Sequence, residues 1–482
     1  MSTPSFPGGN TPRFAVLSDR AVRRLHAAAL GTLANVGVVV QHEQAVELLH
    51  SVGCSVNGSL VKTPPELVEE AIRLAPSSVP VYNRLGGLQM QLEGHNVYYG
   101  TGGSCPYAAE IDGTRTPFTT EQCAKNVQLT DTLDQLDFYM AMAHCSDAPV
   151  AVRDVHEVAT VLANTTKPSI ITSHTRRSLD VIVEMCKTVS GSTEAFRSEP
   201  YLIYYTEPVS PLQHSAHSVD KLLCAVEHGL PILNTPAPMA GATAPITLIG
   251  TLLTGLAELL SGLVLIQNYR KNSPVIFGGV LTTLDMKGMT FTYGSPELQL
   301  MNAAIADMSR HYELPSFGTA GATDSHEVDV QTAFECGTSI VLNALSGSNL
   351  VHDVGWMSGA QAISNELMVL CDEMIGYARR CRGGIDIDLL DRSAAELADV
   401  GPGGTFIDRE FTFELYLKEQ WHPALMNRVS HTAWLDSDRT PLNTRLKART
   451  DQLLAEHRPP EIAAAEQREI QKIIGAYDAE MI

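Results

Sequence analysis

Eight short apolar segments recur along the middle of the chain, and they constrain its fold more than any other feature. Each ends in polar or glycine residues and is followed by a segment with helical periodicity. The segments cover residues 97–103, 136–145, 168–174, 201–208, 231–238, 274–280, 314–321 and 349–355. Their separation of roughly 30 to 40 residues leaves room for one helix per crossover, which is the spacing of a (β/α)₈ barrel.

A doubly wound open sheet accepts the same pattern, but the chain has no GxGxxG phosphate loop, and this favours closure. We therefore expect an α/β protein with a (β/α)₈ TIM barrel over residues 96–380. Residues 1–95 are predicted to form a helical N-terminal extension, and residues 381–482 a helical C-terminal extension that caps or oligomerises the barrel.

Charge excludes two classes of partner. The 482 residues include 54 acidic and 34 basic side chains, a formal net charge of −20, and the acids are scattered. Such a field repels the phosphates of nucleic acid and anionic lipid, so neither is an expected partner. It favours a cationic ligand, although the same charge also serves solubility.

Cysteine usage and apolar stretches indicate a cytoplasmic protein. The nine cysteines include no CxxC pair, which predicts reduced core thiols. The first residues lack the apolar core of a secretion signal. The most apolar stretch, residues 244–266, is interrupted by polar residues and Glu258, so it fits a buried helix better than a membrane span.

Aromatic and acidic residues gather at the predicted strand ends, which meet at one mouth in a barrel. A quaternary ammonium ion donates no hydrogen bond and is held by aromatic faces and carboxylates, so this set predicts such a ligand. Aromatic residues in strands more often belong to the core, and that alternative stays open for each one. The predicted substrate-binding residues are Tyr98, Tyr99, Tyr107, Tyr204, Tyr205, Glu207, Phe277, Phe317, Asp353 and Trp356.

Other chemistries find less support. No HxxxH, HExxH or HxH motif lies near a carboxylate partner, so zinc catalysis is not indicated and no intrinsic metal is expected. Glu207 and Asp353 could serve as the paired carboxylates of a glycoside hydrolase. The chain has only three tryptophans, however, which is few for a sugar platform.

Four motifs point to a known family. They are YYGTGGSCPY (98–107), FGTAGATDSHEVDVQ (317–331), NALSGSNLVHDVGWMSGAQAIS (343–364) and GPGGTF (401–406). Together they resemble the trimethylamine methyltransferase superfamily over nearly the whole chain. The resemblance implies a barrel that binds a methylated amine in its mouth and passes a methyl group to the Co(I) corrinoid of a small carrier protein.

Founding members of that superfamily insert pyrrolysine, and the resemblance implies a position for it near His326 or at the neighbouring residues 323–325. This chain contains none. It therefore resembles the non-pyrrolysine branch, whose members act on quaternary amines such as glycine betaine. The resemblance implies catalytic roles for Asp324, His326 and His352, and close approach of the corrinoid at Gly102, Gly103, Gly318 and Gly321.

Structural alternatives remain for these residues. Asp324 could cap the helix that follows it, and His352 could be a buried histidine with satisfied hydrogen bonds. The glycines could simply turn the chain. At the level of function we expect a corrinoid-dependent betaine methyltransferase that forms a homo-oligomer. The alternatives are a non-catalytic quaternary-amine-binding protein and a barrel hydrolase or lyase that uses Glu207 and Asp353.

Overall fold

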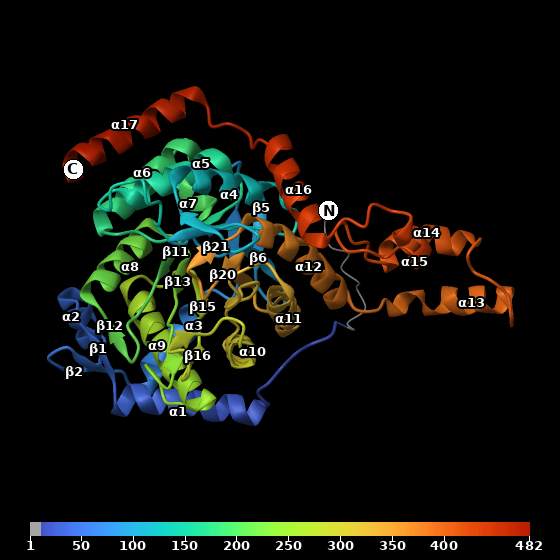
Figure 1. Cartoon of the computed structure of the whole chain (residues 1–482). Coiled ribbons are helices and arrows are strands. Elements are labelled where there is room, and N and C mark those ends of the chain that lie inside the picture. The colour runs from blue at the N-terminus through green and yellow to red at the C-terminus, as the bar shows by residue number, and fades with distance from the viewer. Residues whose placement is uncertain (1–10) are drawn as a thin grey trace.

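A barrel of eight parallel strands forms the centre of the protein (Figure 1). The computed structural model describes residues 11–482. The barrel strands are β6 (Tyr98–Thr101), β9 (Tyr139–Ala141), β10 (Ser169–Ile171), β11 (Leu202–Thr206), β13 (Ile232–Asn234), β15 (Val275–Gly278), β18 (Ser316–Thr319) and β19 (Leu350–Val354). Each lies within one of the eight apolar segments, so the predicted (β/α)₈ barrel is confirmed.

The barrel closes between its first two strands. The sheet order runs β6, β19, β18, β15, β13, β11, β10, β9. Gly100 on β6 then bridges in parallel to Phe138, just before β9. The Asp137 N–H donates to the carbonyl of Tyr99 at 2.6 Å. A side chain at Gly100 would collide with the Phe138 ring, so glycine is what permits this close approach.

One helix or more follows each strand and covers the outside of the barrel. These helices are α4 (Thr120–Thr132), α5 (Arg153–Asn164), α6 (Arg176–Ser190) with α7 (Thr193–Ser198), α8 (Ala216–His228), α9 (Leu248–Tyr269), α10 (Pro296–His311), α11 (Val330–Ser346) and α12 (Asn365–Gly383). Side chains cap most of their N-termini, for example Ser215 on α8, Ser295 on α10 and Asp329 on α11. Each cap satisfies a backbone N–H that the helix itself leaves free.

A β-hairpin closes the N-terminal end of the barrel. It consists of β4 (Val79–Tyr82) and β5 (Leu88–Leu92). Its buried side chains Val79, Val81, Met90 and Leu92 share one apolar cluster with inward-facing barrel residues such as Ile170 and Ile276. Because this end is filled, ligand access is left to the opposite end, where the strands terminate.

The rest of the N-terminal segment contains strands as well as the predicted helices. The helices are α1 (Asp19–Asn35), α2 (Glu43–Ser51) and α3 (Pro65–Leu74). Between them β1 (Val38–Val40), β2 (Ser55–Asn57) and β3 (Leu60–Lys62) form a small sheet with β12 (Gln213–His214). Helices α1 and α3 pack against α9.

Among the described residues, α9 is the one helix long and apolar enough to cross a membrane by length and composition, and 83% of its most apolar window is buried inside the protein. Core helices of soluble proteins have the same features.

Five further helices follow α12. They are α13 (Leu390–Val400, preceded by a 3₁₀ turn at Ile387–Leu389), α14 (Glu410–Glu419), α15 (His431–Leu435), α16 (Leu442–Glu456) and α17 (Ala464–Met481). Helices α13 to α15 form an arm that projects away from the barrel, whereas α16 and α17 return to it (Figure 1). Helix α16 packs on α4 and α12, and α17 packs on α5 and α6.

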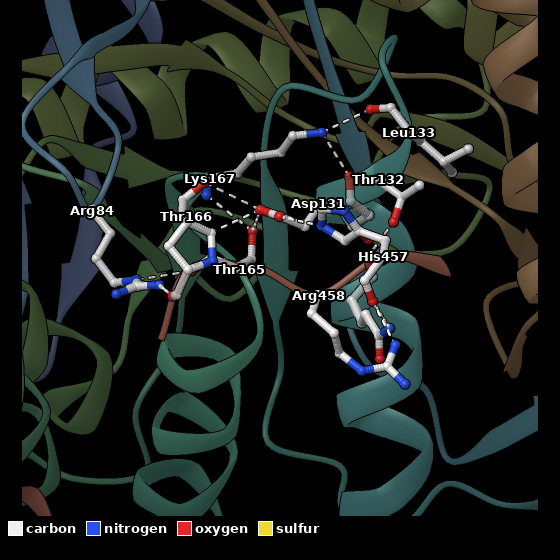
Figure 2. A network of polar contacts seen from close by, with 12 residues as sticks. Arg84, Asp131, Thr132, Leu133, Thr165, Thr166, Lys167, His457 and Arg458 are labelled. Atoms are coloured by element: carbon white, nitrogen blue, oxygen red, sulfur yellow. Dashed lines mark hydrogen bonds and ion pairs between the residues drawn. The ribbon is translucent and has the colours of Figure 1, made fainter. Parts of the chain in front are cut away.

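A polar network fastens this returning segment to the barrel (Figure 2). The Asp131 carboxylate accepts hydrogen bonds from Thr165 Oγ1 at 2.6 Å and the Thr166 N–H at 2.8 Å, and it lies 2.7 Å from His457 Nε2. Lys167 Nζ donates to two carbonyls near the end of α4, each at 2.7 Å. One carboxylate thus joins α4, the loop before β10 and the segment after α16.

Candidate functional site

The mouth is the end of the barrel where its strands terminate, and two small sheets flank it. One contains β7 (Tyr107–Ala109), β8 (Arg115–Pro117), β20 (Trp356–Met357) and β21 (Ala362–Ile363). The other contains β14 (Met239–Ala240), β16 (Thr282–Asp285) and β17 (Thr290–Phe291). Both are built from the loops that follow barrel strands, where TIM-barrel enzymes carry their active sites.

Five aromatic rings form a continuous arc at the mouth. Tyr205 and Phe317 have ring centroids 6.5 Å apart, and Phe317 stacks on His352 at 4.1 Å with an interplanar angle of 20°. The His352 ring lies 6.2 Å from Trp356, which meets Tyr293 edge-on at 5.6 Å. We call these residues the aromatic arc: Tyr205, Phe317, His352, Trp356 and Tyr293.

Glycines allow Trp356 to take its place in the arc. Its Nε1 donates to the carbonyl of Gly103 at 2.7 Å. A Cβ on Gly102 would lie 2.2 Å from the indole ring, closer than any real contact. Of the two predicted glycines, Gly102 therefore makes room for the tryptophan, whereas a Cβ on Gly103 would collide with Met142.

Asp353 places a carboxylate among these rings. Its side chain is 0% exposed, and neither carboxylate oxygen has a hydrogen-bond partner among residues 11–482. His352 Nδ1 lies 2.5 Å from Oδ1 but is not aligned for a hydrogen bond. Burial raises the pKa of Asp353, and the neighbouring imidazole opposes the shift only in part. A buried carboxylate whose oxygens lack aligned donors favours a positively charged ligand beside it.

The backbone at Asp353 is also unusual. Its φ angle is +79°, in the left-handed region, and the register between β19 and β6 shifts between Val351 and Val354. Such a conformation costs about 1–3 kcal/mol in a residue other than glycine and concentrates at functional sites. The irregularity breaks the in-out alternation of β19 at the residue that carries the charge.

Glu207 supplies a second acid, one that solvent reaches. It follows β11, is exposed at the mouth and accepts a short hydrogen bond from the Tyr205 hydroxyl. Loss of surrounding water raises the pKa of Glu207, although the Tyr205 bond opposes this. The pKa of Tyr205 is raised by its burial and by Glu207 and Asp353, which places both acids near the same ring.

Asp324 holds the loop that carries Tyr293. Its two carboxylate oxygens accept hydrogen bonds from the N–H groups of Tyr293 and Gly294, both at 2.9 Å. The Asp324 N–H in turn donates to Glu335 on α11 at 2.9 Å. The cap of α11 is Asp329, not Asp324. Asp324 is therefore a positioning residue for the aromatic arc.

His326 lies on the rim and not inside the mouth. Its side chain is exposed, and Nδ1 is 2.8 Å from the Ser358 hydroxyl and 3.2 Å from the Arg115 guanidinium. It reaches none of the ring contacts of the arc. His352, by contrast, is buried, stacked on Phe317 and 3.1 Å from Thr319 Oγ1 through Nε2.

Several predicted residues point elsewhere. Tyr99 and Tyr204 face outward and bond to the Ile340 carbonyl at 3.0 Å and the Ser173 hydroxyl at 3.0 Å. Phe277 also faces outward, against Tyr312. Tyr98 also lies away from the interior of the mouth, because its hydroxyl accepts from the Gln91 N–H on the closing hairpin. Tyr107 is 41% exposed on β7. Gly318 faces Asn343 and Ser348. Gly321 has φ +75° and packs against Val354.

Sequence reasoning missed Tyr293 and Glu157. Tyr293 lies in a loop well after β15, so no strand pattern marks it; the only local signal is the Ser295-Pro296 helix start that follows. Glu157 on α5 is 1% exposed and accepts hydrogen bonds from Ser104 Oγ at 2.7 Å and the His144 N–H at 2.8 Å. From its position on α5, Glu157 thus connects the loop after β6 with the loop after β9.

Comparison with known proteins identifies a family and agrees with the fold. The model of the family described as trimethylamine methyltransferase (MTTB) matches residues 3–481. A trimethylamine methyltransferase of Desulfitobacterium hafniense is 30% identical over 95% of this chain and 93% of its own. A glycine betaine methyltransferase of the same species is 27% identical over 93% and 94%. The crystal structure of Methanosarcina barkeri monomethylamine methyltransferase shares the fold, with a TM-score of 0.52 at 12% identity over 93% of this chain and 89% of that one.

Proposed function

The chain belongs to the trimethylamine methyltransferase family, and on that premise we propose that it moves a methyl group from a quaternary amine to the Co(I) corrinoid of a separate carrier protein. Glycine betaine is the first substrate to test, because one relative is named for it. The lack of pyrrolysine supports a quaternary over a tertiary amine. Membership in a methyltransferase family argues against the two alternatives, a non-catalytic binding protein and a hydrolase that uses Glu207 and Asp353.

One observation carries the proposal: a buried carboxylate without donors stands beside an arc of aromatic rings. A quaternary ammonium ion has charge but no N–H, so it neutralises Asp353 without needing hydrogen-bond geometry. Aromatic faces within about 6 Å of such a cation attract it through their quadrupoles. A tertiary amine must be protonated to present the same charge, and the free oxygens of Asp353 can then accept its N–H, so the substrate panel below distinguishes the two classes of amine.

The reaction requires little proton transfer by the protein. Positive charge on nitrogen already makes the methyl carbon electrophilic, and the departing tertiary amine is neutral, so no general acid is required. The corrinoid, when bound, supplies the nucleophile that accepts the methyl group. Asp353 and the arc hold the cation in one orientation, and the surrounding walls exclude water. Glu207 lies at the entrance, where it attracts the incoming cation.

The rim offers apolar surface that fits a carrier protein with its corrinoid. Four side chains from the segments that follow β13 and β15, one of them in the first turn of α9, are largely exposed: Ile246 (63%), Ile249 (55%), Met286 (63%) and Met289 (67%). We call them the apolar rim. A Cβ on Gly241 would touch both Ile246 and Met286, so these two side chains flank the same point. Exposed apolar patches of this kind are typical of protein contacts.

The test is methyl transfer to added Co(I) cobalamin with a panel of glycine betaine, other betaines, choline and trimethylamine. We expect loss of the Co(I) absorbance together with the demethylated amine, detected by mass spectrometry, for at least one quaternary amine. Transfer from trimethylamine alone would contradict the substrate class. Absence of transfer from every amine tested would contradict the methyl-transfer proposal.

A second experiment separates the mouth from the rim. Met286→Glu and Met289→Glu are expected to slow transfer to a protein-bound corrinoid about tenfold or more, because docking loses apolar contact. Transfer to free cobalamin should be unchanged. Equal loss with both acceptors would show that the rim variants damage the site itself, and no loss with the carrier would place its docking surface elsewhere.

A further inference from the structure

Three side chains with metal-binding atoms meet on the outside of the barrel, away from the mouth. Asp180 lies on α6, and Cys224 and His228 lie on α8. His228 Nε2 is 2.7 Å from Asp180 Oδ1, and Cys224 Sγ is 3.4 Å from the same oxygen. One ligand atom from each residue lies within 4.8 Å of the others.

The scaffold under this cluster is rigid. Cys224 and His228 are four residues apart, so they lie one above the other on a single helix face. Helices α6 and α8 pack against each other and cover neighbouring strands β10 and β11. Helix α6 begins with a capping box at Thr175 and Ser178, and α8 ends at Gly229 with φ +79°. The three side chains are therefore fixed by regular elements and not by a loop.

Local charge favours a cation. The Arg176 guanidinium pairs with Glu227 and lies 3.6 Å from Asp220. Asp180 interacts with the neighbouring Arg177, whose guanidinium pairs with Glu480. The carboxylates of Asp180, Asp220, Glu227 and Glu480 therefore outnumber the two guanidinium groups, and the cluster carries excess negative charge. A divalent ion offsets the excess, and the attraction is strengthened because Cys224 is buried.

We propose that Asp180, Cys224 and His228 form a binding site for a divalent transition-metal ion of the zinc class. The ligand atoms are one oxygen, one sulfur and one nitrogen, a set that zinc accepts and that magnesium and calcium do not favour. The Asp180 side chain is 41% exposed, which leaves a fourth coordination position open to water. The bound ion would link α6 to α8, a role separate from the methyl-transfer site.

Binding must release a proton. The Cys224 thiol now donates to Asp180; when sulfur binds the ion, the S–H bond breaks and its proton passes to solvent. His228 Nε2–H also donates to Asp180, at 2.7 Å; when Nε2 binds the ion this proton is displaced, and the neutral imidazole carries its one proton on Nδ1. Because the ligand atoms must lose these protons before they bind the ion, apparent affinity should rise with pH.

The test uses Co²⁺ as a spectroscopic probe on the full-length protein. We expect one equivalent to bind at pH 8, with a near-ultraviolet thiolate-to-cobalt band that Zn²⁺ displaces. Cys224→Ser should remove the band, and Asp180→Asn should weaken binding by about 10- to 100-fold. The matched control is Cys381→Ser, which changes a free cysteine outside the cluster and should leave both unchanged.

Stability supplies an independent measurement. Zn²⁺ should raise the melting temperature of the wild type and of Cys381→Ser but not of Cys224→Ser, since an ion that binds only the folded state stabilises it. If Cys224→Ser fails to fold, the Asp180→Asn variant tests the proposal in its place, because the Asp180 side chain is partly exposed. A cobalt band that persists in Cys224→Ser, full affinity in Asp180→Asn, or no binding by the wild type at pH 8 would overturn the proposal.

Discussion

The Asp353 carboxylate opposes folding. It is 0% exposed, its oxygens lack hydrogen-bond donors among the described residues, and its backbone has φ +79°. Burying a carboxylate that no aligned donor stabilises is unfavourable, and the left-handed backbone adds to the cost. A protein retains such a residue where a ligand offsets the charge. A substitution that removes the charge of Asp353 should therefore raise the stability of the protein and lower its activity.

We expect Asp353→Asn to melt at a higher temperature than the wild type at pH 8 and to lose at least about 100-fold in kcat/KM. The sign follows from the raised pKa of Asp353: the charged form destabilises the fold above that pKa, and the penalty disappears as pH falls through it. The stability difference between the two proteins should thus shrink toward pH 4. Thermal melts across this range and steady-state kinetics measure both effects.

Asp307 provides the matched control for this substitution. It is also buried, at 7% exposure, but its carboxylate accepts hydrogen bonds from the Val16 and Leu17 N–H groups at 2.9 and 2.8 Å. Asp307→Asn should therefore destabilise the fold and leave kcat/KM per folded molecule unchanged. If Asp353→Asn also loses stability and keeps its activity, Asp353 is a structural residue.

Asp324 acts on the site through Tyr293. Asp324→Ala removes both hydrogen bonds to the Tyr293-Gly294 backbone, so the Tyr293 ring should lose its fixed place beside Trp356. We expect a rise in KM of about tenfold with a smaller fall in kcat, because the arc binds the cation in ground and transition states alike. Substrate kinetics measure the split.

The control for Asp324 is a second acid in the same loop. Asp329→Ala removes the cap of α11, which costs about 1 kcal/mol of stability. It leaves the Asp324 bonds in place, so KM should stay near the wild-type value. Equal rises in KM for both variants would mean that general loosening of the loop, and not the position of Tyr293, controls binding.

At the scale of elements, the strands were predictable because a parallel barrel buries both faces of every strand and so leaves an apolar run in the sequence. Because both faces of each strand are apolar, the sequence does not show which side chains point into the barrel. Tyr205 and Phe317 face the mouth, whereas Tyr204 and Phe277 face the helices, and no alternation of polar and apolar residues distinguishes them. The short strands β1 to β3 escaped prediction as part of a helical extension because each spans only three residues, whereas the alternating pattern around residues 84–87 does indicate the β4–β5 hairpin.

The network around Asp131 links elements that are distant in sequence, and its pH dependence is testable (Figure 2). Burial opposes ionisation of Asp131, but hydrogen bonds from Thr165, Thr166 and His457 outweigh it and lower its pKa. A lowered acid pKa stabilises the fold above the unfolded value, about 3.9 for aspartate, and this contribution is lost as pH falls through the folded pKa. Asp131→Asn should thus be destabilised by about 1–3 kcal/mol at pH 7.

Denaturant unfolding at several pH values measures this effect. The difference between Asp131→Asn and the wild type should shrink below about pH 4, where the wild-type carboxyl group takes up a proton. Asp134→Asn, at an exposed acid in the turn just after α4, should match the wild type throughout. A constant difference at every pH would assign the loss to packing and not to charge.

At the scale of the whole molecule, the arm of α13 to α15 leaves apolar surface uncovered. Neither α13 nor α15 buries a single side chain, although both contain leucines. Short helices without tertiary packing are marginal in water. The barrel presents a second uncovered surface on α11, where Val330 is 86% exposed and Phe334 is 71% exposed. Two different apolar surfaces on one chain suit a head-to-tail ring, in which each arm covers the next subunit.

We therefore expect the wild type to form a homo-oligomer whose arm lies in the interface. Leu397→Asp, at a side chain 62% exposed on α13, should reduce the mass measured by light scattering from a multiple of 52.1 kDa toward 52.1 kDa. Ala395→Asp adds the same charge on another part of that helix surface and should keep the oligomer. A 52.1 kDa wild type at micromolar concentration would contradict the expectation, because the arm would then be stable without a partner. Phe334→Asp tests the receiving surface: it should dissociate the oligomer as Leu397→Asp does if α11 binds the arm, and should leave it intact if the arms bind one another.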